Sequence, residues 1–494
     1  MQTLSGVFHE IHSCAMNIGF INLLRSLAFG SAMLFFTACS AVGPDYVRPD
    51  IVMPKEWNAG IGMGISPGPV DPHELAGWWS TLNDPVLSGL MENGVKGNSD
   101  LRKARARVRE ARARRGISKA GLFPSIDTSG SITKRRGSED TGSGNESELY
   151  DAGFDAGWEL DVFGGVRRSI QSAEADLMAS EEDLHDVLVT LLSEIALNYI
   201  EVRSFQARMS IAVANLELQT ETYEITQWRF QAGLITQLDV EQARYNLEQT
   251  KSEIPSLHIG LKQAENRIAL LLGKTPGSLN DELAEQRSLP SPPAGVAVGI
   301  PADILRQRPD IRRAERQLAS QTAKVGAATA ELYPHFNLTG SIGLEALTLN
   351  NLFRYGSRSY RVSPGFSWNI FDAGSIRQNI EVQNALQEQA MIQYEQTVLA
   401  ALEDVENALV SYYGDQERMH SLEKASQASQ LASDIAQIQY ASGLIDFQTV
   451  LTAQRSLLSL QDQLEASRAD VTSNLVRLYK ALGGGWTTMA NEKK

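Results

Sequence analysis

Two stretches of the chain alternate apolar and polar residues with the period of two that is typical of a β-strand. Between residues 150 and 162, Tyr, Ala, Phe, Ala, Trp, Leu and Val occupy every second position, with Asp, Gly or Glu between them. A second run of this kind covers residues 360–370. Because successive side chains of a strand point to opposite faces, each run predicts a strand with one apolar and one polar face. Residues 123–133 and 336–344 alternate less regularly and predict two further strands.

These four runs have the length of strands that cross a bilayer at a tilt, about 10 residues each. Tyr150, Trp158, Tyr360 and Trp368 are candidates for the aromatic belt at the membrane interface. Alternation alone leaves soluble hairpins as an equal alternative. In lipid, however, every backbone group must be paired, and four strands cannot close a barrel by themselves. If the strands are membranous, several copies of the chain must pool them, and three copies give twelve strands.

Two very long stretches have the periodicity of helices. Residues 164–232 and 374–442 contain no proline, and their apolar residues recur at helical spacing. At 1.5 Å per residue, each stretch predicts a helix about 100 Å long. We expect these helices to pair side by side, with the apolar stripes as packing core. Returning helices are predicted over residues 236–272 and 446–482, and Pro255 should break or bend the first of them near Glu253.

The chain is one architectural unit written twice. Trp158 and Trp368 are 210 positions apart, as are Gly233 and Gly443, and four other pairs share this offset. The same offset of 210 positions, kept without insertions or deletions over most of the chain, indicates a duplication. The predicted organisation is a first copy at residues 100–273, a linker rich in Pro, Ser and Gly at 274–309, a second copy at 310–483 and a tail at 484–494.

The N-terminal residues have the character of an export signal. After Arg25, residues 26–38 carry no charge and include an apolar run that is too short to span a bilayer. This run ends in Phe-Thr-Ala followed by Cys39, which resembles a bacterial lipobox. We expect a lipoprotein signal peptide at residues 1–38, a lipid on Cys39, and a lipidated segment with a short amphipathic stretch at residues 39–99. A plain signal peptide with an incidental cysteine is the alternative.

The composition excludes several classes of function. Lys and Arg number 45 against 59 Asp and Glu, so the formal charge is −14, which argues against a nucleic-acid partner. With two cysteines, seven scattered histidines and no metal or phosphate-binding motif, the sequence predicts neither an enzyme nor a cofactor, apart from the lipid. Arg and Lys are concentrated in residues 101–115, where we expect a solvated helix face near anionic lipid.

The order of these elements behind a lipobox resembles the outer-membrane factor family, the TolC-like and OprM-like efflux channels, including the NodT-type efflux lipoproteins. This resemblance implies an α+β membrane protein. Duplicated long α-helical hairpins form a periplasmic barrel, and four β-strands per chain contribute to a trimeric 12-stranded β-barrel. The resemblance is carried by the motifs Val42-Gly-Pro-Asp-Tyr46, Arg308-Pro-Asp-Ile-Arg312, Leu332-Tyr-Pro334, Tyr440-x-x-Gly-Leu444, Ala453-Gln-Arg-Ser-Leu457 and Tyr479-Lys-Ala-Leu-Gly-Gly-Gly-Trp486.

The resemblance also implies a function. A homotrimer in the cell outer membrane, anchored by its lipid, passively conducts substrates out of the cell, after a periplasmic adaptor protein and an inner-membrane pump deliver them. Such pumps are commonly of the resistance-nodulation-division type. Two alternatives stay open: a periplasmic lipoprotein that serves as a coiled-coil scaffold or adaptor, and the outer-membrane duct of type I secretion. A cation preference follows if the acidic strand face lines the lumen, where the carboxylates are Asp151, Asp155, Glu159 and Asp161.

For the helical turns and the gate behind them, the resemblance points to individual residues. The tip candidates for adaptor contact are Gly233, Leu234 and Thr236 in the first copy, and Gly443 and Leu444 in the second.

Acidic rings often close the tunnel of such channels, but Thr449 and Thr452 occupy the corresponding positions here. Asp239 is equivalent to Thr449 in the first copy and supplies one carboxylate per subunit. The gate candidates therefore include Arg455 as a partner of Asp239 or Asp446. A solvated surface role is the alternative for each of these residues.

Overall fold

The computed structural model describes residues 41–59, 65–66, 68, 71–142, 144–293, 295–299, 301 and 307–486. The predicted signal peptide and Cys39 therefore lie outside the described residues. The chain divides into two units, which are described separately. The first comprises residues 1–48, 110–178 and 316–392, and the second comprises residues 49–109, 179–315 and 393–494.

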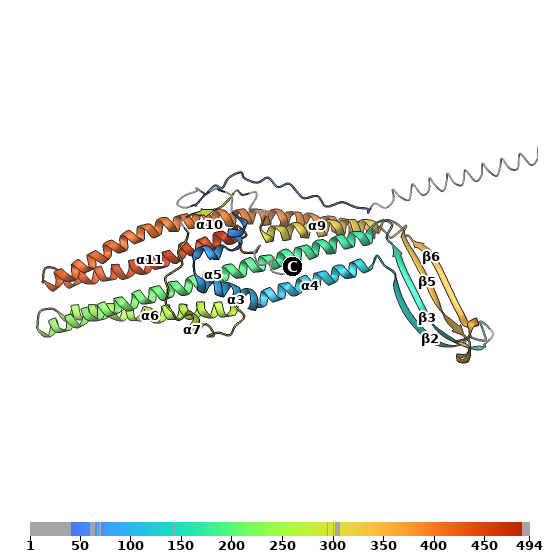
Figure 1. The fold of residues 1–494 in the computed structure, drawn as a ribbon, viewed down its shortest axis with the longest axis horizontal. Helices are drawn as coiled ribbons and strands as arrows, with labels where there is room; N and C mark the ends of the chain where they lie inside the picture. Colours follow the sequence, from blue (N-terminus) through green and yellow to red (C-terminus); the bar gives the residue numbers. More distant parts are fainter. Residues whose placement is uncertain are drawn as a thin grey trace, which may run out of the picture. The chain divides into compact units, whose positions relative to one another are not determined.

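The first unit contains a four-stranded antiparallel sheet with the order β2-β3-β5-β6 (Figure 1). Its strands overlap the four predicted runs, with ends that differ by a few residues. Trp368 and Ile370 follow β6 instead of lying in it, because β6 ends at Ser367. The strands are β2 (Ser125–Arg136), β3 (Glu146–Leu160), β5 (His335–Ala346) and β6 (Arg358–Ser367).

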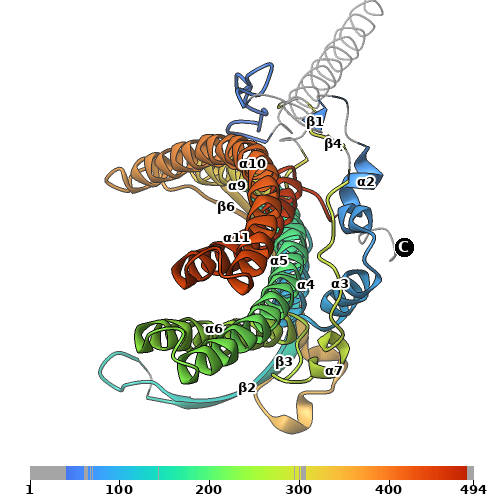
Figure 2. The same ribbon diagram turned by 90° about the vertical axis from the view of Figure 1, so that its left-hand side faces the viewer.

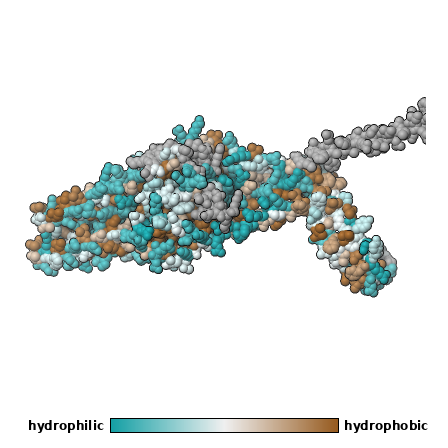
Figure 3. All heavy atoms as spheres, in the orientation of Figure 1, coloured by the Kyte–Doolittle hydropathy of each residue, from teal (hydrophilic) through white to brown (hydrophobic). Residues whose placement is uncertain are grey.

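The strand register gathers the apolar residues on one face of the sheet. Phe154 of β3 lies opposite Thr128 and Ile342, and Ile342 lies opposite Tyr360. Tyr360 is 86% exposed, and Ile126 on the same face is 70% exposed. Figure 3 shows hydrophobic residues on the visible surface of these strands. Within the described residues, this apolar face has no covering layer, which is the arrangement expected of a sheet that contacts lipid.

The opposite face of the sheet is acidic. Asp155 pairs directly with Asp127 across β2 and β3, and Asp151 pairs with Glu345 across β3 and β5. Like charges opposite each other destabilise a sheet, so these pairs need water or counter-ions around them. Asp161, which was expected on this face, lies beyond β3, and its carboxylate accepts hydrogen bonds from the backbone N–H groups of Val166 and Arg167 at 3.1 and 2.9 Å.

The helices reproduce the duplication. Each helix of the second copy begins 210 residues after its counterpart and has the same length, namely 67, 35 or 22 residues. In Figure 1, α6 runs back beside α5, and α11 runs back beside α10. The predicted hairpins are thus present. The first copy has α4 (Ser99–Ala120), α5 (Gly165–Gln231) and α6 (Gln237–Leu271), and the second has α9 (Pro309–Ala330), α10 (Ser375–Ala441) and α11 (Phe447–Ala481).

Pro255 does not interrupt α6, so the expected break near Glu253 is absent. A proline inside a helix removes one hydrogen bond and clashes with the preceding turn, at a cost of about 3 kcal/mol. Buried residues lie on both sides of it, among them Ala243, Leu257 and Leu261. This packing holds the two halves of α6 in one helix. No helix within the described residues is both long and apolar enough to cross a bilayer.

The core of the second unit lies around the middle of the long helices. Trp78 is fully buried and stacks on Tyr479 of α11, with ring centroids 5.5 Å apart. Gly94 of α3 (Pro85–Gly97) faces Ile195 of α5 so closely that a Cβ would clash. Trp57 donates its indole N–H to the carbonyl of Gly299 at 3.2 Å. Segments before the first copy and between the copies therefore pack onto the helices.

The remaining elements of the second unit are short. The strands β1 (Ile65–Ser66) and β4 (Val296–Ala297) pair in parallel. The short helices α2 (Pro72–Ala76) and η1 (Trp78–Leu82) precede the first copy. The helix α7 (Asn280–Leu283) lies between the copies, and its Leu283 is buried. In the first unit, the loop between β5 and β6 holds η2 (Leu349–Asn351) and η3 (Tyr355–Ser357).

Candidate functional site: the hairpin tips and the contacts behind them

Both hairpins turn at a glycine in the left-handed conformation. Gly233 and Gly443 each have φ +74°. The N–H of Gly233 donates to the carbonyl of Phe230 at 2.8 Å, and the N–H of Leu234 donates to that of Arg229 at 2.9 Å. These two bonds satisfy carbonyls at the end of α5, as in the Schellman motif. Any other residue would be strained at this φ, so the glycines fix the shape of both tips.

The first residues of the returning helices cap those helices. Thr236 accepts a hydrogen bond from the backbone N–H of Asp239, whose carboxylate in turn accepts the Thr236 N–H at 2.9 Å, forming a capping box. Asp446 caps α11 and accepts the N–H and the hydroxyl of Thr449 at 2.8 and 2.6 Å. These two hydrogen bonds lower the pKa of Asp446. Within one chain, these gate candidates therefore hold the tips in shape.

The tips expose apolar side chains at their ends. Leu234 and Leu444 occupy equivalent positions and are 71% and 74% exposed. Leu238 and Trp228 near the first tip are exposed as well. Figure 2 looks onto this end of both hairpins, and Figure 3 shows hydrophobic residues on its surface. Apolar side chains gathered at the ends of two hairpins are typical of a surface that binds another protein.

Behind the tips, hydrogen bonds join the first hairpin to the second. Arg208 of α5 donates through Nε and Nη2 to the two carboxylate oxygens of Asp462 on α11, at 2.7 and 3.0 Å. The pairing is bidentate, which is the strongest geometry for an ion pair of these types. Two amide contacts add to it, one between Gln454 and the Thr222 hydroxyl and one between Asn215 and Gln461, each at 3.0 Å.

Arg455 does not contact Asp239 or Asp446 within the chain. Its Nε donates to Oδ1 of Asn246 on α6 at 2.5 Å, and its guanidinium lies over the ring of Tyr245, 5.3 Å from the centroid. Thr452 donates its hydroxyl to the carbonyl of Gln448 at 2.8 Å, inside its own helix. Within one chain, Arg455 therefore pairs with Asn246, and both aspartates are engaged at their own helix ends.

A polar cavity of about 710 Å³ separates the two hairpins behind these contacts. Gln219 and Asn246 in its wall each have one buried amide atom without a hydrogen-bond partner among the described residues. Burial, together with the charge of Asp462, raises the pKa of Glu253, which also lines the cavity. The wall of the cavity is therefore hydrophilic. A polar interface separates at a lower cost than a packed apolar one, because water can hydrogen-bond the polar groups that become exposed.

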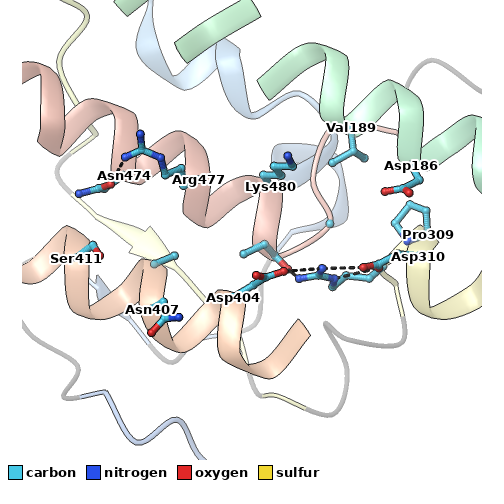
Figure 4. A pocket seen from close by; sticks show the side chains of 14 residues that line it. Asp186, Val189, Pro309, Asp310, Asp404, Asn407, Ser411, Asn474, Arg477 and Lys480 are labelled. Atoms are coloured by element: carbon cyan, nitrogen blue, oxygen red, sulfur yellow. Dashed lines mark hydrogen bonds and ion pairs between the residues drawn. The ribbon is translucent and has the colours of Figure 1, made fainter. Parts of the chain in front are cut away.

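At the other end of α11, Arg308 ties together three helices. Two of its partners, Asp310 and Asp404, are labelled in Figure 4. Arg308 is buried and donates to the carbonyl of Ala481 at 2.9 Å, to Asp310 at 2.8 Å and to Asp404 of α10 at 2.9 Å. Together with Arg477, these residues line a cavity of about 330 Å³. The motif that opens the second copy therefore acts as a cross-link between the start of α9, α10 and the end of α11.

This cross-link predicts a pH dependence of stability. Burial by itself raises the pKa of Asp310, but the hydrogen bonds and charge of Arg308 outweigh it, so the pKa lies below its ordinary value. A carboxyl with a lowered folded-state pKa stabilises the fold above its unfolded-state pKa, and this stabilisation is lost as the pH falls below about 4. We expect Asp310→Asn to lower stability at pH 7 by roughly 1.5–3 kcal/mol, the value of a hydrogen bond to a charged group.

Thermal unfolding measured between pH 7 and pH 3 checks this expectation. The melting temperature of the wild type should decrease once the pH is lowered below 4. The melting temperature of the Asp310→Asn variant should decrease less over the same pH range. Asp100→Asn is the matched control, because Asp100 holds the same position in the first copy and is exposed. Equal losses in the Asp310 and Asp100 variants at pH 7 would contradict the role of the ion pair.

Comparison with known proteins places this geometry among channels. The family described as outer membrane efflux protein matches residues 91–274 and 300–484. Nodulation protein T of Rhizobium leguminosarum bv. trifolii is 33% identical over 469 residues, which cover 92% of this chain and 97% of that protein. The solvent efflux pump outer membrane protein SrpC of Pseudomonas putida is 33% identical, over 93% of this chain and 98% of that one. The outer-membrane channel OprN is similar in structure, with TM-score 0.86, 38% identity and coverage of 90% and 99%.

Proposed function

Because the chain belongs to the outer membrane efflux protein family, we propose that its hairpin tips bind a periplasmic adaptor and that its pump is of the resistance-nodulation-division type. The protein is the outer-membrane channel component of a tripartite efflux system, and its helical tunnel lies in the periplasm. The predicted fold class is confirmed: duplicated helical hairpins form the tunnel, and four strands per chain contribute to a trimeric 12-stranded barrel. As a conduit, it needs no catalytic residue and no cofactor.

The adaptor contact is supported by the tips themselves. Gly233 and Gly443 set the two turns, Thr236 caps the following helix, and Leu234 and Leu444 project into solvent at both ends. A few residues near the centre of a contact usually carry most of the binding energy. The two tips differ at the position after Ile235 and Ile445, which is Thr236 in one and Asp446 in the other. We propose that the adaptor distinguishes the tips by this difference.

The gate is supported by the links between the hairpins. Opening a tunnel made of helical hairpins requires one hairpin to move relative to another. The ion pair of Arg208 with Asp462 and the contact of Arg455 with Asn246 both cross that boundary. In the trimer, Asp239, Asp446, Thr449 and Thr452 are proposed to line the narrow end next to these links. Three copies of each carboxylate there would attract cations.

The membrane belt is supported by two equivalent tryptophans at one end of the sheet. Trp158 donates its indole N–H to the carbonyl of Leu122, and Trp368 donates to that of Leu332, each at 3.0 Å. Both rings remain partly exposed, which suits a residue that sits between lipid and water. Tyr150 and Tyr360 are proposed to complete the belt from within β3 and β6. The lipid on Cys39 is proposed as a covalent anchor in the same membrane.

A reconstitution experiment tests the proposed function. The purified full-length trimer is placed in a planar bilayer for conductance, and a strain lacking the chain is tested for efflux of a fluorescent dye. We expect ohmic channels in the bilayer, and loss of efflux that returns with the wild-type gene. Pull-down with the adaptor encoded beside a resistance-nodulation-division pump should recover the trimer. A monomer without conductance would overturn the proposal and favour a periplasmic scaffold.

A further inference from the structure

A buried arginine near the start of α5 grips the backbone just after the predicted lipid site. Arg168 is 3% exposed. Its Nε donates to the carbonyl of Val42 at 2.9 Å, and its Nη2 donates to the carbonyls of Gly43 and Ala41 at 3.0 and 3.3 Å. Its Nη1 donates to Asp45 at 2.7 Å and to Gln171 at 2.9 Å. A guanidinium has five N–H donors, so four of the five are spent on residues 41–45.

The backbone around this arginine is shaped to receive the segment. The N–H of Val42 donates to the carbonyl of Phe163 at 3.0 Å, which joins the segment to the connection between β3 and α5. Gly43 has φ +85°, and a Cβ on it would collide with Gly326 of α9. Gly326 in turn packs against the side chain of Arg168, where a Cβ would lie 2.8 Å from Cδ. Close approach on both sides of the segment requires glycine.

The duplication offers an internal comparison. The position equivalent to Arg168 in the second copy is Gln378, and the position equivalent to Gly326 in the first copy is Gly116. A Cβ on Gly116 would meet nothing within 4 Å. The grip is therefore present only in the half of the sheet unit that faces residues 41–45. Local helix formation does not require an arginine at this position, since Gln378 occupies it in a helix of the same length.

Removing the segment would be costly. Among the described residues, Asp45 is the only carboxylate that pairs with Arg168, and it is 85% exposed at its side chain. If residues 41–45 detached, a buried guanidinium would lose this charge and three carbonyl acceptors at once. A buried charge without partners is strongly unfavourable, so the segment stays in place.

We propose that Arg168 is a positioning residue that fixes the lipid-bearing N-terminus at the junction between strand and helix. Cys39 precedes Ala41 by two residues and therefore lies within about 7 Å of it along the chain. Ala41 packs against Gly164, which follows the end of β3 by four residues. The acyl chains consequently enter the bilayer leaflet that surrounds this end of the sheet. The lipidated end of the chain is therefore held in one position and does not move as a flexible linker.

This proposal rests on the proposed lipidation, and a spin label tests the grip independently of it. Val47 is 80% exposed and lies just beyond the gripped residues. A nitroxide on Val47→Cys in the full-length lipoprotein, reconstituted in liposomes, should be immobile in the wild-type background. In Arg168→Gln, which installs the residue of the second copy, we expect the correlation time to drop about tenfold, toward the ns motion of a free terminus. Gly43→Ala, which substitutes no helical residue, should release the label as well.

The matched control is Arg377→Gln, which makes the same substitution at the neighbouring, exposed position of the second copy. The label should stay immobile there. An immobile label in Arg168→Gln trimers, or a mobile label in the wild type, would overturn the grip. Mass spectrometry that finds Cys39 without acyl chains in a conducting trimer would overturn the leaflet placement alone. If the wild-type trimer holds the label immobile but conducts no ions, the result would count against the channel function and not against the contact of Arg168 with residues 41–45.

Discussion

Replacing Leu234 and Leu444 together by glutamate is expected to abolish adaptor binding while the trimer still assembles. Both side chains project from the tips and are largely exposed, so the fold depends little on them. Burying a carboxylate in place of an apolar anchor costs about 2 kcal/mol or more per site. Two sites per chain then weaken adaptor binding by about 10³-fold. Titration of the adaptor onto the immobilised trimer measures this, and dye efflux in cells should fall to the level of the deletion strain.

The control for charge alone is Gln231→Glu with Gln448→Glu. Both glutamines are exposed at the same tips, and the changes add the same two negative charges while keeping both leucines. Adaptor binding should change little in this variant. If both double variants bind the adaptor as tightly as the wild type does, the tips are not the docking surface.

Breaking the link between the hairpins is expected to open the channel. Arg208→Gln removes the bidentate pair with Asp462, and Gln454→Ala removes the contact with Thr222. The ion pair is partly exposed, which reduces its contribution, so we expect the two losses together to shift the closed state by about 2 kcal/mol. This corresponds to a change of about 30-fold in the ratio of open to closed channels. Single-channel recording in a planar bilayer measures the ratio directly.

Arg418→Gln is the matched control for the link. Arg418 is the equivalent of Arg208 in the second copy, but it faces Asp415 and Asp470 within the α10–α11 hairpin. Its loss removes an arginine without releasing one hairpin from the other. A conductance that rises equally in both arginine variants would show that the cross-hairpin pair does not hold the tunnel closed.

The sequence determined the elements of this protein through local patterns. The offset of 210 residues placed the hairpins and their turns, because a duplicated sequence repeats its helix ends, glycines included. Period-two alternation assigned the two faces of the sheet before any partner strand was known, since the pleat alone decides where Tyr360 and Asp155 point. Four strands that cannot close also required an oligomer. These inferences need only the covalent geometry of the backbone and the cost of unpaired groups in lipid.

Only the tertiary structure decided which side chains meet. Arg208 and Asp462 are separated by 254 positions, and Asp462 corresponds to Ser252 in the first copy, so neither spacing nor the repeat pointed to this pair. Arg455 found Asn246 because its expected partners were already used as helix caps, and Pro255 stayed inside α6 because packing on both sides outweighed the local penalty. In the sequence, nothing distinguishes Arg168 from other arginines in the predicted helices. Long-range pairing depends on the three-dimensional arrangement of whole elements, whereas strand and helix patterns depend on neighbours in the chain.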